Sequence, residues 1–128
     1  YRVLKPGGKL ILADGFQKKD SFTQEEKEMM GKWLSSWAVP NLAITEQFAT
    51  SMKAIGFKNF QYENVVHNVL PFSRWLYRMG ILAYPIAKIL EWLQIRSETE
   101  TRNVVGAFWQ YRCLKWGLWE YIIFRGEK

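Results

Sequence analysis

Residues 1–16 read YRVLKPGGKLILADGF, and this stretch decides the fold. Its first four residues read like the end of a helix. Pro6 then presets φ at the first central position of a tight turn, and Gly7 supplies the positive φ of the second. The apolar run at 9–13 is typical of a strand covered on both faces, as in a parallel sheet. The pair Asp14-Gly15 is expected to end this strand.

Two helices and a second strand are expected next. Thr23 and Glu26 form a capping box ahead of apolar residues at helical spacing, which predicts a helix through Trp37. Thr45 is expected to cap another helix, and Gly56 to end it in a left-handed conformation. The following FKNFQYENVVH reads as a strand. A strand, helices and a strand in this order fit a right-handed crossover between parallel strands.

The C-terminal half is mainly helical and closes with a strand. Residues 71–95 predict two short helices divided at Pro85, and these helices share one long apolar stripe. A further helix follows. The last strand, at 118–124, is apolar on both faces apart from Glu120, which indicates a central position in the sheet.

Three motifs carry a resemblance to a known family. RVLKPGGKLILAD resembles the segment that enters the fifth strand of class I S-adenosylmethionine-dependent methyltransferases. EQFATSMKAIGFKNFQ is similar to the helix, Gly-Phe turn and sixth strand of that family, and YRCLKWGLWEYIIFRGEK to its seventh strand. The resemblance covers nearly the whole chain. It implies an α/β fold: the C-terminal half of a Rossmann-like methyltransferase sheet, with two parallel strands, a final antiparallel strand between them, and a helical insertion.

The resemblance also implies a division of the chain. It predicts a single partial domain, with a strand–helices–strand unit at 1–70, a helical cap at 71–116 and the closing strand at 117–128. The opening stretch is then a cut point, and the cofactor half of the parent enzyme lies ahead of Tyr1.

The cofactor implied for the parent enzyme is S-adenosylmethionine. In the family, a glycine-rich loop after the first strand lets the backbone approach this cofactor closely. No Gly-x-Gly-x-Gly sequence occurs in the 128 residues. We therefore expect no cofactor-binding residue in this fragment, and we expect the fragment alone to be inactive. No cluster of His, Asp and Glu has the spacing of a metal site.

The insertion at 71–116 resembles the small-molecule branch of the family, such as sterol and tocopherol methyltransferases. This resemblance implies methyl transfer to a small, apolar acceptor. The alternative is a non-catalytic interaction module, or a membrane- or lipid-binding module, built on the half-fold.

Ligands of open α/β sheets bind at the carboxyl ends of the parallel strands. This rule selects Asp14 and Phe16 after the first strand and His67 after the second. Asp14 is a candidate to orient the acceptor, and His67 is a candidate general base because its unperturbed pKa lies near neutrality. The other readings are an Asp-Gly turn and a structural histidine.

Aromatic residues on the helices are the remaining candidates for substrate binding. Trp33 and Trp37 lie one helical turn apart. They either line a substrate cavity or, as we favour, belong to a core between this helix and the sheet. Trp75 and Tyr84 belong to the stripe of the insertion, which either covers an apolar substrate or is itself core.

The net charge and its distribution limit the classes of partner that we expect. The net charge is +6, but the 18 Lys and Arg residues are dispersed and Lys18-Lys19 is the only adjacent pair, so we expect no nucleic-acid partner. Seven Trp residues and the positive charge leave peripheral contact with a membrane open. We expect a cytoplasmic protein, with membrane association as the open alternative. The unpaired edge of the strand at 9–13 predicts a homodimer.

Overall fold

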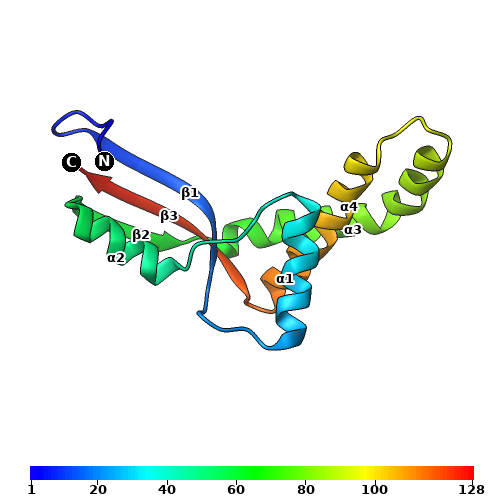
Figure 1. Cartoon of the computed structure of the whole chain (residues 1–128), viewed down its shortest axis with the longest axis horizontal. Coiled ribbons are helices and arrows are strands. Elements are labelled where there is room, and N and C mark those ends of the chain that lie inside the picture. The colour runs from blue at the N-terminus through cyan, green and yellow to red at the C-terminus, as the bar shows by residue number, and fades with distance from the viewer. The chain divides into compact units, whose positions relative to one another are not determined.

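The computed structural model describes all 128 residues, which form three strands and four helices (Figure 1). In chain order the elements are β1 (Lys9–Gln17), α1 (Gln24–Ser36), α2 (Thr45–Ile55), β2 (Lys58–Asn64), α3 (Val66–Trp92), α4 (Glu98–Lys115) and β3 (Trp119–Glu127). They belong to two compact units. The first holds Tyr1–Asp20, Leu42–Val66 and Trp119–Lys128, and the second holds Ser21–Asn41 and His67–Leu118. This is the α/β class that the sequence predicts.

The sheet of the first unit has the strand order β1-β3-β2, and β3 is antiparallel to both neighbours (Figure 1). β1 and β2 therefore run in the same direction without pairing with each other. The central position expected for the last strand is confirmed, and its residues Ile122 and Phe124 are almost fully buried. The outer edge of β1 has no neighbouring strand in the sheet. The homodimer expected at this edge stays a prediction.

β1 is longer than the sequence indicates. The Asp-Gly pair does not end it: Asp14 lies opposite Ile122, and pairing continues to Gln17 opposite Trp119. An antiparallel partner supplies ladder hydrogen bonds through these residues and overrides their preference for turns. Gly15 also makes room, since a Cβ there would lie 3.3 Å from the ring of Trp119.

The turn before β1 forms as expected. Gly7 has a φ of 73°, the left-handed value that the turn requires. Its N–H donates to the carbonyl of Lys128 over 2.9 Å, and the N–H of Lys128 donates to the carbonyl of Gly8 over 3.0 Å. The turn therefore extends the pairing of β1 with the C-terminal end of β3.

The core of the first unit lies between the sheet and α2. Its buried members are Phe16, Ala49, Ile122 and Phe124, and Leu12, Phe48 and Phe60 pack around them. Phe124 lies at the centre, with ring centroids 4.9 Å from both Phe16 and Phe48. Burial of one such side chain stabilises the fold by about 1.5–3 kcal/mol. As expected, Gly56 ends α2 in the left-handed conformation, at a φ of 102°.

The second unit contains α1, α3 and α4. The capping box of Thr23 and Glu26 at the start of α1 is confirmed. α1 packs against α4: the indole Nε1 of Trp37 donates to the carbonyl of Asn103 over 3.4 Å, and Arg102 donates to the carbonyl of Ser35 over 2.6 Å. These contacts group residues 21–41 with the helical part of the chain, whereas chain order placed them with the strands.

α3 is one helix and not the two that the sequence predicts. It begins at Val66 and continues through Pro71 and Pro85. A proline removes one hydrogen bond and bends a helix, but packing of the following turns against another helix keeps the helix continuous. No helix of the chain combines the length and the hydropathy that crossing a bilayer requires.

Gly106 allows the close approach of α1 and α4. A Cβ at this position would overlap the indole ring of Trp37, whereas a Cβ at Gly31 on α1 would meet nothing within 4 Å. We expect Gly106→Ala to lower the free energy of unfolding by about 1–3 kcal/mol through overpacking. The matched control Gly31→Ala is expected to raise it by about 0.5–1 kcal/mol, because alanine loses less backbone entropy in a helix. Urea titrations of both variants measure the difference, and equal effects would contradict this account.

Candidate functional site

A half-buried carboxylate lies at the carboxyl ends of β1 and β2. Glu120, the second residue of β3, accepts a hydrogen bond from the hydroxyl of Thr45 over 2.6 Å and one from the amide Nδ2 of Asn64 over 2.7 Å. Thr45 is buried, and Asn64 is the last residue of β2. Each oxygen of the carboxylate is therefore held by a side chain from a different element.

The role of Thr45 differs from the one expected. The sequence predicts it as an N-cap, but Ile44 occupies that position without a side-chain hydrogen bond, and the Thr45 hydroxyl turns to Glu120 instead. A charge-assisted hydrogen bond is stronger than a neutral cap. Sequence reasoning missed this cluster. Its one local signal was that Glu120 is the single charged residue in an otherwise apolar strand segment.

A second polar pair lies on the same face of the sheet. The hydroxyl of Tyr62 donates to a carboxylate oxygen of Glu46 on α2 over 2.7 Å. This hydrogen bond raises the pKa of Tyr62, since it favours the protonated phenol, and burial and the nearby negative charge act in the same direction.

The second unit contains an apolar groove of about 300 Å³ between α3 and α4. We call it the α3–α4 groove. Gly80, Ile81 and Tyr84 line it from α3, and Val104, Val105 and Phe108 line it from α4. Gly80 brings the two helices close, since a Cβ there would already lie 3.5 Å from the carbonyl of Val104. The hydroxyl of Tyr84 is the one polar side-chain group in this lining.

Aromatic rings border the groove at Phe108. The rings of Tyr77 and Phe108 are stacked with centroids 5.0 Å apart, and the ring of Tyr111 lies 4.8 Å from that of Tyr77. The guanidinium of Arg112 lies 5.6 Å from the ring of Phe108. Rings held by stacking and by a cation form a stable wall for an apolar ligand.

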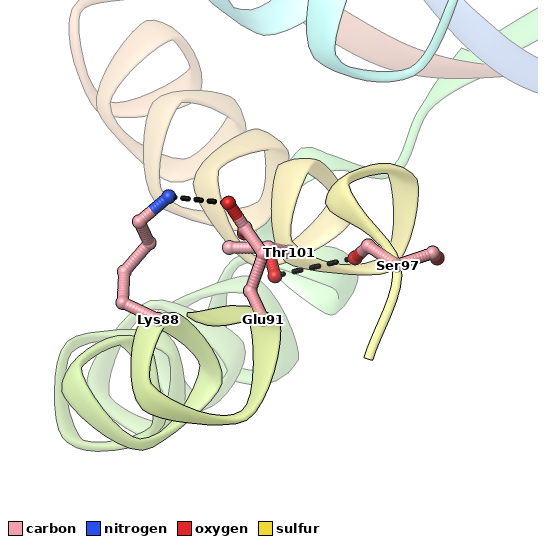
Figure 2. A network of polar contacts seen from close by, with 4 residues as sticks. All are labelled: Lys88, Glu91, Ser97 and Thr101. Carbon is pink, nitrogen blue, oxygen red and sulfur yellow. Dashed lines mark hydrogen bonds and ion pairs between the residues drawn. The ribbon is translucent and has the colours of Figure 1, made fainter. Parts of the chain in front are cut away.

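Polar contacts near the turn between α3 and α4 are drawn in Figure 2. The Nζ of Lys88 lies 2.6 Å from a carboxylate oxygen of Glu91, its neighbour on α3. Thr101, on α4, donates to the carbonyl of the N-cap Ser97 over 3.4 Å. The hydrogen bond from Lys88 lowers the pKa of Glu91, and the hydroxyl of Thr101 lowers it further.

Asp14 and Phe16 lie on β1, as the sequence implies, but within the strand and not beyond it. Asp14 is exposed, and its carboxylate accepts a hydrogen bond from the N–H of Gly15 over 2.7 Å. Phe16 is a core residue beneath α2. Of the two, only Asp14 is open to a ligand.

His67 lies in the first turn of α3 and is exposed, three residues beyond the end of β2. Trp75 also lies on α3 and is exposed, with its ring stacked on that of Phe72 at 5.7 Å. Tyr84 lines the α3–α4 groove. Positions 75 and 84 face opposite sides of a helix at 100° per residue, so Trp75 does not join the lining.

Trp33 and Trp37 come together on α1 with ring centroids 6.0 Å apart. Trp33 is buried, and Trp37 packs over Gly106 of α4. These are contacts of helix on helix, so the core expected between this helix and the sheet is not what Trp37 forms.

The glycines of the opening turn do not have the placement of an S-adenosylmethionine cradle. Gly7 and Gly8 precede a strand, and Gly8 serves the turn itself, since a Cβ there would lie 2.8 Å from the carbonyl of Lys5. A cradle needs glycines that follow a strand and open a helix. No group of three or more His, Cys, Asp or Glu side chains is placed to hold a metal ion.

No protein-family model matches the chain. It is similar to the 2-methyl-6-phytyl-1,4-hydroquinone methyltransferase of Synechocystis, with 35% identity over 78 residues, which cover 59% of this chain and 24% of the relative. The chain thus spans about a quarter of the length of this relative.

Solved structures extend the comparison to nearly every residue. Phosphoethanolamine N-methyltransferase 2 of Haemonchus contortus matches 99% of this chain with 28% of its own, at a TM-score of 0.63 and 19% identity. The cyclopropane synthase MmaA2 of Mycobacterium tuberculosis matches 98% of this chain with 46% of its own, at a TM-score of 0.66 and 14% identity.

The chain has the fold of part of these two methyltransferase structures. In this methyltransferase fold, the sheet of the first unit and the helices of the second have counterparts in both solved structures, since each covers the chain almost completely.

The contact between Lys88 and Glu91 predicts a pH dependence of stability. A carboxyl whose pKa is lowered on folding contributes stability above its usual value of 4.5, and this contribution is lost as the pH falls through the folded-state pKa. We expect Glu91→Gln to melt at a lower temperature than the unchanged protein at neutral pH, with the gap closing in acid. Lys88→Gln is expected to show the same closing gap. Melting curves between neutral and acidic pH test this, and a gap that is constant with pH would contradict it.

Proposed function

We propose that the whole protein carrying this chain transfers a methyl group from S-adenosylmethionine to a small, largely apolar molecule. The similar protein of Synechocystis is named as a methyltransferase of a hydroquinone that carries a phytyl chain. One solved structure is a complex of an N-methyltransferase with S-adenosylhomocysteine. Because the chain spans about a quarter of that relative, the activity is proposed for the whole protein.

The observation that carries the substrate class is the α3–α4 groove. Its volume of about 300 Å³ is at the lower end of the range for small-molecule sites, and its lining is apolar except for one hydroxyl. An apolar tail or ring buried there loses its contact with water, which is favourable. The hydroxyl of Tyr84 is proposed to bind a polar group of the acceptor.

Methyl transfer needs few protein groups. S-adenosylmethionine supplies an activated methyl group on a sulfonium when it is bound, and the protein chiefly aligns the acceptor and excludes water. In this chain the α3–α4 groove is proposed to hold the acceptor. His67 as general base and Asp14 as an acceptor contact stay predictions from the sequence, and the proposal for the groove does not rest on them.

The Glu120 cluster has a supporting role in this proposal. Both of its oxygens already accept hydrogen bonds from Thr45 and Asn64, so the carboxylate is positioned but occupied. Asn64 also accepts the N–H of Val66 over 3.0 Å, where α3 begins. The cluster is proposed to hold the strand ends in place while other groups contact the substrate.

The proposed function is tested by a substitution that fills the α3–α4 groove with a larger side chain. In the protein expressed from its complete coding sequence, Val105→Trp is expected to lower kcat/KM for an apolar acceptor at least about tenfold, which corresponds to a loss of about 1.4 kcal/mol of transition-state stabilisation. The affinity for S-adenosylmethionine is expected to stay unchanged. The matched control is Val3→Trp, the same substitution at a valine that is 85% exposed and outside the groove.

The acceptor panel contains a prenylated hydroquinone, a simple phenol and an amine. Activity on the hydroquinone that Val105→Trp leaves intact would contradict the role of the groove. Absence of methylation with every acceptor would favour the non-catalytic alternative instead.

A further inference from the structure

α3 exposes a row of large apolar side chains. They alternate at spacings of three and four residues and are between 43% and 67% exposed. The members on α3 are Phe72, Trp75, Met79, Leu82, Ile86 and Ile89, and Leu93 directly follows the helix. We call this row the outer stripe. From Phe72 to Ile89 it extends about 26 Å at the rise of an α-helix. A contiguous apolar surface of this length marks a site of interaction.

Most of the outer stripe lies away from the packing of α3 within its unit, although Met79 borders α4 and lines a groove with Val104 and Ala107. The buried residues of α3 are Ser73, Gly80 and Ala87, all small and spaced by seven. Gly80 is the point of close contact with Val104 of α4. The helix therefore packs through its small residues and leaves the large ones on another face, which reverses the usual arrangement of an amphipathic helix.

The charges beside the outer stripe are mainly positive. Arg74 and Arg78 lie on α3, whereas Lys88 and the single acidic residue of the helix, Glu91, pair with each other. The chain as a whole has a net charge of +6. Cationic side chains beside an exposed apolar face are characteristic of helices that lie on anionic lipid surfaces.

A second copy of the chain is the competing partner, because spacings of three and four residues also occur in coiled coils. Coiled coils gain specificity from opposite charges that flank the apolar seam. The flanking positions here are Pro71, Arg78, Pro85 and Trp92 on one side and Leu76, Ala83 and Leu90 on the other. They offer no acidic partner for Arg78, so the charge pattern favours an anionic surface over a second copy.

We propose that α3 binds an anionic lipid surface through its outer stripe. The apolar side chains enter the boundary between headgroups and acyl chains, and Arg74 and Arg78 lie at the level of the lipid phosphates. Trp75 and Trp92, near the two ends of the stripe, have the amphipathic rings that concentrate at such interfaces. Since no helix of the chain can cross the bilayer, α3 lies along the surface. This inference does not depend on the proposed methyl transfer.

The test is co-sedimentation of the protein, expressed from its complete coding sequence, with vesicles. Binding is expected to phosphatidylcholine vesicles that contain phosphatidylglycerol, and to weaken at high salt. The pair Leu82→Gln and Ile86→Gln is expected to reduce binding at least about tenfold. The pair Arg74→Gln and Arg78→Gln is expected to reduce it about fivefold for each charge on anionic vesicles, with little effect on vesicles of phosphatidylcholine alone.

The matched control is Ile55→Gln, at a residue on α2 that is 52% exposed and outside the outer stripe. It is expected to bind as the unchanged protein does. Three results would overturn the proposal: no binding to anionic vesicles, a dimer in sedimentation analysis that Leu82→Gln dissociates, or a large fall in melting temperature of Leu82→Gln without lipid. The last two would show that a second copy or the protein itself covers the stripe.

Discussion

The structure depends on the insertion of β3 between β1 and β2. Neither outer strand pairs with the other, so every ladder hydrogen bond of the sheet involves residues at the C-terminal end of the chain. The buried side chains of Ile122 and Phe124 join both outer strands to the helix that covers them. The sheet therefore needs β3 to pair with strands that lie far earlier in the sequence, and closing these long loops costs entropy and slows folding.

The start of β3 also positions the polar groups at the strand ends. Glu120 binds Thr45 on α2 and Asn64 at the end of β2, and Asn64 accepts the first N–H of α3. A carboxylate held on two sides is a rigid point, because moving it would leave at least one buried partner unsatisfied. The methyltransferase fold thus places a fixed polar cluster at the end of the sheet where α/β proteins bind ligands.

α3 uses two of its faces for different purposes. Small residues pack against α4, where Gly80 lets the helices approach and leaves the apolar groove beside Tyr84 and Phe108. Large residues lie on another, exposed face and form the outer stripe, which borders α4 at Met79. If both proposals hold, a lipid-like acceptor and the surface that contains it are bound by neighbouring faces of one helix. Because the groove and the outer stripe lie on neighbouring faces of α3, an apolar acceptor would pass from the lipid to the groove with little exposure to water, which is unfavourable for apolar groups.

The sequence by itself determined the features that depend on near neighbours. The capping box at Thr23, the left-handed glycines at 7 and 56 and the central character of the last strand follow from adjacent residues or from local pattern, and each formed as expected. Tertiary structure decided the rest. β1 continues past Asp14 because Ile122, far along the chain, pairs with it; Thr45 leaves its cap for Glu120; and α3 continues through Pro85 where the sequence predicts a break. Local preferences are worth about 1 kcal/mol each, and a buried contact or a charged hydrogen bond formed at long range exceeds them.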